Sequence, residues 1–147
     1  MKKLLLFFLA TTLLISCSDD EGNTQAPDYV RAKINGIEYN FTVFDLDKQT
    51  YTDNGYTYTD VIIDAALSND STRHIRFVVE QGITGPDASW MFAYYVNNVP
   101  HMKDENFTFV VSESTDKFVK GTFAGRVVNV DTGDEFTVTD GTFSVNH

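Results

Sequence analysis

Residues 30–43 have the sequence VRAKINGIEYNFTV, in which apolar and polar side chains alternate on both sides of Asn35-Gly36. A period of two is that of a β-strand with one buried face. Asn-Gly is the preferred pair for a two-residue type I′ turn, because both turn residues must adopt positive φ. The stretch therefore predicts an antiparallel β-hairpin, with Val30 and Ile34 facing the core.

The same alternation continues to the end of the chain. It predicts further strands over 56–67, 74–80, 90–96, 107–111, 117–130, 135–139 and 142–145. Loops and turns are expected at 45–53, 68–72, 82–86, 100–106, 112–116 and 131–134, where polar residues, Gly and Pro gather. About eight or nine short strands separated by turns predict an all-β fold, an antiparallel β-sandwich or a partly open barrel.

Residues 87–97 leave two interpretations open. A period of two would place Trp90 on the same face as Phe92 and Tyr94, which favours a strand. The run DAS at 87–89 is instead able to cap a short helix. The strand is the preferred interpretation.

The first residues of the chain are typical of a targeting signal. Two lysines precede an apolar run over 4–15, which is shorter than the roughly 20 residues of a membrane-spanning helix. The run ends in LISC at 14–17, which resembles the bacterial lipobox. In proteins with that motif the Cys sulfur receives a diacylglycerol and the peptide is cut before the Cys. The resemblance implies a signal peptide at 1–16, a lipidated Cys17 opening a flexible acidic tether at 17–27, and one β domain at 28–147.

The residues directly after Cys17 are acidic. Ser18, Asp19, Asp20 and Glu21 resemble the surface-export signal of Bacteroidota lipoproteins. That resemblance implies a lipid anchor, with acyl chains such as palmitate, on the outer face of the outer membrane. Alternatively, the run is a solvated spacer and the domain faces the periplasm.

The C-terminal third carries a family resemblance. Residues 120–125 (KGTFAG), 131–133 (DTG) and 136–143 (FTVTDGTF) look like the end of a family of small Bacteroidota lipoproteins, and 32–36 (AKING) is similar to its first hairpin. The family has no established activity, so the resemblance implies a fold and a location but no catalytic residue. Gly-Thr-Phe occurs at both 121–123 and 141–143, which indicates neighbouring strands where Gly permits a bulge.

Composition excludes several classes of function. The 147-residue chain has a formal charge of −10. Removing Lys2 and Lys3 with the signal peptide leaves nine basic against 21 acidic residues, a charge of −12. Such a protein is not expected to bind nucleic acid, which needs clustered Lys and Arg. His74 and His101 are expected at the surface, and no hydrolase or zinc motif is present. We therefore expect no enzyme, no metal and no cofactor.

The tyrosines of the long strand over 56–67 are the best functional lead. Tyr56 and Tyr58 share a face with Asp60, opposite the apolar face, and Tyr51 lies in the adjoining loop. Aromatic rings pack on the C–H groups of sugars while carboxylates bond their hydroxyls. The alternative is that these rings cover sheet edges or pack into the core.

The function expected from these features is that of a binding or accessory module. Its partners would be the membrane, through the lipid anchor, and a glycan or cell-surface protein. The alternative is a structural or interaction subunit of an outer-membrane complex without a small-molecule ligand.

Overall fold

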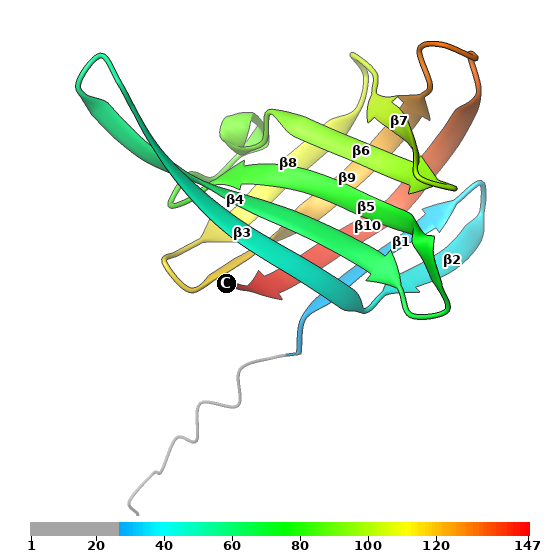
Figure 1. The fold of residues 1–147 in the computed structure, drawn as a ribbon, viewed down its shortest axis with the longest axis horizontal. Coiled ribbons are helices and arrows are strands. Elements are labelled where there is room, and N and C mark those ends of the chain that lie inside the picture. Colours follow the sequence, from blue (N-terminus) through cyan, green and yellow to red (C-terminus); the bar gives the residue numbers. More distant parts are fainter. Residues whose placement is uncertain (1–26) are drawn as a thin grey trace, which may run out of the picture.

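Ten antiparallel β-strands make up the computed structural model, which describes residues 27–147 (Figure 1). The strands are β1 (Tyr29–Ile34), β2 (Ile37–Phe41), β3 (Val43–Asp53), β4 (Tyr56–Leu67), β5 (Asp70–Glu80), β6 (Met91–Val96), β7 (Val99–Lys103), β8 (Thr108–Ser114), β9 (Phe118–Val128) and β10 (Glu135–Asn146). A 3₁₀ helix, Pro86–Ala88, precedes β6, and no α-helix occurs among the described residues. The predicted all-β fold is confirmed.

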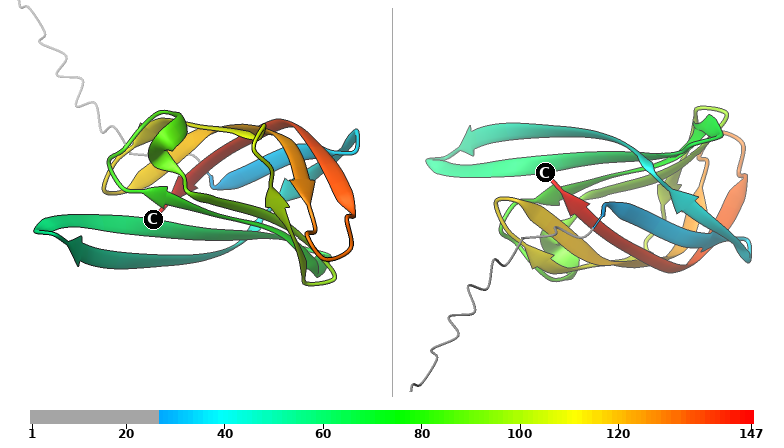
Figure 2. Two further views of the ribbon diagram at one scale, coloured as in Figure 1. Left: turned by 90° about the horizontal axis from the view of Figure 1, so that it is seen from above. Right: turned by 90° about the horizontal axis from the view of Figure 1, so that it is seen from below.

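One curled sheet contains all ten strands, in the order β2-β1-β10-β9-β7-β6-β5-β4-β3, with β8 also paired to β9. The strand β9 has β8 beside its first part and β7 beside its last residues. The sheet therefore curls into a half-barrel with two layers, one of β3 to β6 and the other of β1 and β8 to β10 (Figure 2).

The core lies between these layers and is rich in phenylalanine. Neighbouring rings have centroids 4.9–6.4 Å apart. The rings belong to Phe77, Phe92, Phe109, Phe123 and Phe143. Fully burying such a side chain contributes about 1.5–3 kcal/mol each. Both layers supply these residues from inward positions of alternating strands, which is why the period of two predicted the fold class.

The first hairpin forms as predicted. Asn35 and Gly36 have φ of 49° and 82°, and Ile34 pairs directly with Ile37 across the turn. Val30 is fully buried. The left-handed backbone at both turn residues is the reason this turn requires Asn-Gly.

The two Gly-Thr-Phe segments lie opposite each other on β9 and β10, as expected for neighbouring strands. Gly121 pairs with Phe143, and Gly141 pairs with Phe123. Each phenylalanine ring covers the glycine of the other segment, where a side chain would have no room. A register shift beside Gly141 confirms the predicted bulge in β10.

Two predicted loops are strands. Residues 45–53 belong to β3, an edge strand, and most of them are exposed, so their polar sequence resembles that of a loop. Residues 100–103 belong to β7, although Pro100 suggested a break. The Pro100 carbonyl accepts a hydrogen bond from Asn129 Nδ2 at 3.0 Å, which adds a side-chain contact to the backbone hydrogen bonds of this strand. These two strands raise the count above the predicted eight or nine.

Both interpretations of residues 87–97 are partly correct. The 3₁₀ helix occupies 86–88 and β6 occupies 91–96. Trp90 lies between them and is 65% exposed, so its predicted place on the buried face of Phe92 and Tyr94 is wrong. Trp90 does not follow the alternation of buried and exposed side chains because it comes before the first residue of β6.

The signal peptide at 1–16, Cys17 and the acidic residues 18–21 lie outside the described residues, as does most of the predicted tether. Within residues 27–147, no helix has the length and apolar character needed to cross a membrane.

Candidate functional site

The hairpin of β3 and β4 projects beyond the rest of the half-barrel (Figures 1 and 2). From Asp47 to Asp53 every residue of β3 is exposed, because no second layer formed by residues 27–147 covers this part of the sheet. Asn54 and Gly55, with φ of 49° and 83°, close the hairpin in the same way as the first one. The projecting part therefore offers both of its faces to solvent.

Three tyrosines form a row along one face of this projection, and we call Tyr51, Tyr56 and Tyr58 the tyrosine platform. Tyr51 pairs directly with Tyr58, and their ring centroids are 5.5 Å apart. The rings of Tyr56 and Tyr58 are 6.1 Å apart and stacked, with 21° between their planes. Tyr51 was predicted in a loop, and its place in β3 is what aligns it with the other two rings.

Asp60 lies on the same face but does not face solvent. It is 5% exposed, and its Oδ2 accepts a hydrogen bond from the Trp90 indole Nε1 at 3.3 Å. Burial raises the pKa of Asp60, the Trp90 hydrogen bond opposes that shift, and the charge of Glu80 adds to it. In this arrangement Asp60 holds the exposed Trp90 in position beside the platform.

Glu80 supplies a second carboxylate next to the platform. It pairs with Asp60 across β4 and β5, and its Oε1 accepts a hydrogen bond from the Tyr56 hydroxyl at 3.1 Å. That hydrogen bond is the main reason why the pKa of Tyr56 is raised. Sequence reasoning missed both Glu80 and Trp90, because only the strand register and the loop before β6 bring them to Asp60.

The opposite face of the projecting hairpin is held by threonine pairs. The hydroxyl oxygens of Thr50 and Thr59 are 2.9 Å apart, and those of Thr52 and Thr57 are 3.0 Å apart. These cross-strand hydrogen bonds take the place of core packing where the second layer is missing. They fix the pleat of the hairpin and so hold the three tyrosine rings in line.

His74 and His101 have structural partners. His74 bonds to Asp64, and its ring packs against the Tyr95 ring at a tilt of 39°, with 4.1 Å between the ring centroids. His101 is 4% exposed and packs edge-on against Phe136, so its predicted surface position is wrong. Within residues 27–147, no three His, Cys, Asp or Glu side chains gather closely enough to hold a metal ion.

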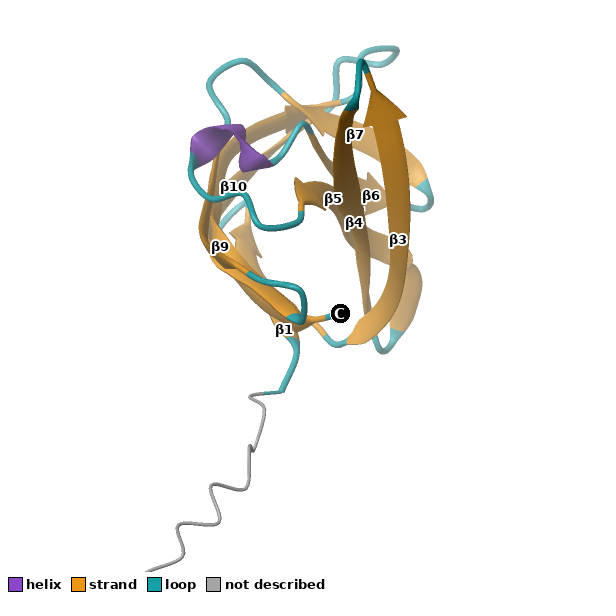
Figure 3. Ribbon diagram, turned by 90° about the vertical axis from the view of Figure 1, so that its left-hand side faces the viewer, coloured by secondary structure: helices purple, strands orange, loops and turns teal. Residues whose placement is uncertain are grey.

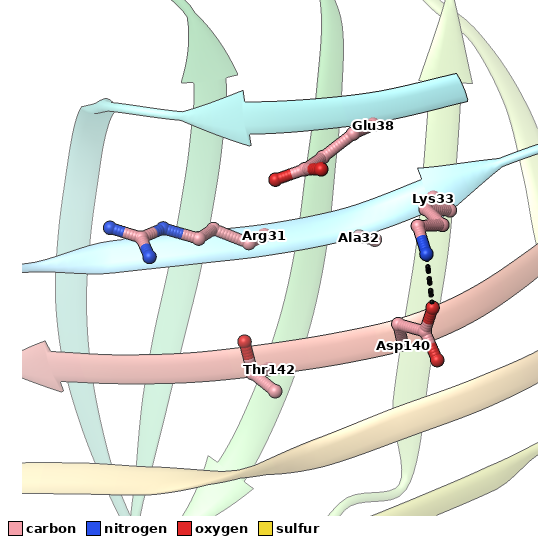
Figure 4. A pocket seen from close by; sticks show the side chains of 6 residues that line it. All are labelled: Arg31, Ala32, Lys33, Glu38, Asp140 and Thr142. Atoms are coloured by element: carbon pink, nitrogen blue, oxygen red, sulfur yellow. Dashed lines mark hydrogen bonds and ion pairs between the residues drawn. The ribbon is translucent and has the colours of Figure 1, made fainter. Parts of the chain in front are cut away.

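A polar hollow of about 270 Å³ lies on β1, β2 and β10 (Figure 4). Its lining includes Arg31, Lys33, Glu38 and Asp140. Lys33 Nζ is 2.8 Å from Asp140 Oδ2, and this hydrogen bond raises the pKa of Lys33. Opposite charges line the hollow and its lysine is already paired, so it presents no single chemistry to a ligand.

Comparison with known proteins gives no family assignment: no family model, curated protein or solved structure matches this chain. The geometry of the described residues is therefore the basis for the functional argument, and the tyrosine platform with Trp90 and Glu80 is the strongest candidate site.

Proposed function

We propose that this chain is a lipid-anchored outer-membrane protein, displayed on the cell surface, whose β domain binds glycans on the tyrosine platform. The observation that carries the proposal is the row of three tyrosine rings on a hairpin that projects beyond the core. The expected lipobox at Cys17 and the acidic run at 18–21 support the location.

The chemistry of the platform suits a sugar chain. A sugar ring has C–H groups on its faces and hydroxyls around its edge, so aromatic rings contact the faces while carboxylates accept hydrogen bonds from the edge. Three rings in a row can contact successive sugars, with Glu80 bonded to Tyr56 and Trp90 bonded to Asp60 on the same face. Because the threonine pairs hold the hairpin in shape, little ordering would be needed on binding.

The alternative function, an interaction subunit without a small ligand, would favour one broad apolar patch. Away from the platform and Trp90, the exposed large apolar side chains of residues 27–147 are spread over several strands and loops. They are Ile37, Val43, Ile83, Val99, Met102, Val110 and Val130. They are distributed over six strands and loops, with Val99 and Met102 both in β7, and this distribution favours the glycan-binding module.

The first prediction concerns the platform itself. The purified protein is screened on a glycan array, and its affinity for the best ligand is measured by calorimetry. Tyr56→Ala and Tyr58→Ala are each expected to weaken binding about tenfold, as central aromatic contacts do. Both side chains lie outside the core, so the fold should be unaffected.

Tyr29→Ala, which removes a partly exposed tyrosine of β1, is the matched control and should bind normally. Absence of binding to every glycan, or equal binding by the platform variants and the wild type, would contradict the proposal. A protein partner that depends on Tyr56 and Tyr58 would support the alternative function instead.

A further inference from the structure

A second hollow, of about 160 Å³, lies next to the β1–β2 turn, whose residue Asn35 belongs to its lining. Its apolar lining comes from Ile34, Ile37, Val96 and Phe136, and its polar lining includes Tyr94 and Arg73. We call it the Tyr94 hollow. It is separate from the tyrosine platform, with which it shares no residue.

Tyr94 presents to this hollow a hydroxyl that has no hydrogen-bond partner in the described part of the chain. The residue is 1% exposed, and its ring packs edge-on against Phe136, with 5.3 Å between the centroids. None of the hydrogen bonds among residues 27–147 involves its hydroxyl. The hydroxyl oxygen is not completely enclosed by protein atoms. The hydroxyl therefore reaches the hollow as the accessible end of a buried side chain.

The hydroxyl is a donor over the whole ordinary pH range. Burial raises the pKa of Tyr94 to about 12, and the nearby positive charge of Arg73 opposes that shift only in part. A buried neutral phenol usually has a hydrogen-bond partner, because leaving one unpaired costs free energy. What is missing at Tyr94 is an acceptor.

Arg73 brings a positive charge to the same place. Its Nη1 donates to the Tyr39 hydroxyl at 3.0 Å, and its guanidinium lies over the Tyr39 ring, 5.4 Å from the centroid. Its Nε is enclosed without a hydrogen bond, 3.8 Å from Asp70 Oδ2, and its Nη2 has no hydrogen bond within residues 27–147. Asp70 itself accepts hydrogen bonds from Thr72, so it satisfies Arg73 only weakly.

The Tyr94 hollow thus combines apolar walls, a cation and a donor without an acceptor. An acceptor with negative charge, such as a carboxylate, would satisfy both polar groups at once. The volume of the Tyr94 hollow is close to the roughly 150 Å³ of an engineered cavity that binds benzene. We propose that the Tyr94 hollow binds a small carboxylate whose apolar body is about the size of one six-membered ring.

The test titrates the purified protein, labelled with ¹³C at its Ile and Val methyl groups, with benzoate, cyclohexanecarboxylate and 3-methylbutanoate. The methyl signals of Ile34 and Val96 are expected to shift with saturation. Benzyl alcohol, which has the same ring without the charge, should bind at least tenfold more weakly than benzoate, because a hydrogen bond to a charged group is the stronger one.

Tyr94→Phe removes only the hydroxyl, which has no hydrogen-bond partner among residues 27–147, so the variant should fold normally and bind benzoate about tenfold more weakly. Arg73→Gln should weaken binding to a similar extent. Tyr95→Phe, on the opposite face of β6, is the matched control and should bind like the wild type. The proposal is overturned if none of the three carboxylates shifts the Ile34 and Val96 signals, if Tyr94→Phe binds as tightly as the wild type, or if benzyl alcohol binds as tightly as benzoate.

Discussion

At the scale of single residues, the paired glycines of β9 and β10 show how closely the core is packed. A Cβ at Gly141 would overlap the carbonyl oxygen and ring of Phe123, and one at Gly121 would overlap the Val110 carbonyl and the Phe143 ring. The ring of each phenylalanine thus occupies the space that a side chain at the opposite glycine would need. Gly-Thr-Phe therefore recurs because the two copies fit each other.

Gly141→Ala is expected to lower the free energy of unfolding by an amount at the upper end of the about 1–3 kcal/mol that overpacking costs. The obstacle includes backbone, which cannot rotate away. Urea unfolding measures the loss. Thr142→Ala, at the next position, should cost under about 1 kcal/mol, the range of one cross-strand pair. Equal stability of Gly141→Ala and the wild type would refute the close fit of glycine and ring.

Asp60 gives a prediction for pH. Burial raises its pKa above the ordinary 3.8, so the folded protein binds a proton more readily than the unfolded chain. Its contribution to stability is therefore greatest at low pH and is lost as the pH rises from the ordinary carboxyl value through the raised one. Asp60→Asn keeps an acceptor for Trp90 and removes the charge, so it should be more stable than the wild type at pH 7.

The measurement is urea unfolding of both proteins across about pH 3 to 7, the range that contains the ordinary and raised carboxyl values. The stability difference should grow as the pH rises. Asp53→Asn makes the same charge change at an exposed position of the same hairpin and serves as the control. A difference that does not depend on pH would show that the Asp60 carboxylate is not destabilised by its burial.

At the scale of elements, the β3–β4 hairpin has two parts with different roles. Near Ile63 the hairpin belongs to the core, and beyond Asp60 it carries the platform, where cross-strand contacts such as the threonine pairs hold the two strands together. Stability within a protein is lower where few apolar contacts are buried. The projecting part should therefore contribute to binding and little to global stability.

Shortening this hairpin tests that division. Gln49 and Asp60 are direct partners, as are Asp53 and Tyr56 at the natural turn. The two pairs are an even number of residues apart, so both have the same position in the hydrogen-bonding pattern of the hairpin. An Asn-Gly turn can therefore join Gln49 to Asp60 in place of residues 50–59. The shortened protein should keep a dispersed NMR spectrum and a stability within about 1 kcal/mol of the wild type, since it loses no residue of the core below Asp60. It should also lose glycan binding. Unfolding of the shortened protein would show that the projection is part of the folding core.

At the scale of the whole molecule, the ends of the β domain meet. The strand β1 pairs with β10, and the Asp28 carboxylate accepts a hydrogen bond from the Asn146 backbone N–H at 2.8 Å. In Figure 3 the two layers stand side by side, with β1 and the end of the chain near each other. The first and last strands of the domain are therefore neighbours in the sheet.

In the proposed function, the location of the whole molecule depends on Cys17. Replacing it with Ala should yield an unlipidated precursor that no longer enters the detergent phase, because one or more acyl chains supply the membrane affinity. Phase partitioning of cell extracts measures this.

Protease treatment of intact cells, with a periplasmic protein as the control, should degrade the wild-type domain. A Cys17→Ala variant that still enters the detergent phase would contradict lipid anchoring, and a fully protected wild-type domain would contradict surface display.

The sequence by itself determined the fold class, the first hairpin with its Asn35-Gly36 turn, and the shared face of Tyr56 and Tyr58. These features follow from local rules, because the period of two and the turn residues act within a few positions of the chain. Even so, the polar edge strand β3 and the short β7 have sequences that look like loops.

Only the tertiary structure decided which strands are neighbours and what their faces bring together. Tyr51 joins the platform through its register with Tyr58, Trp90 bonds to Asp60 across 30 positions of the chain, and Tyr94 meets Arg73 next to the β1–β2 turn. A strand's own residues specify which face is buried, but the partner strand is chosen by the packing of the whole sheet. That choice, which places the platform on the projecting hairpin and the Tyr94 hollow next to the β1–β2 turn, is absent from any local stretch of sequence.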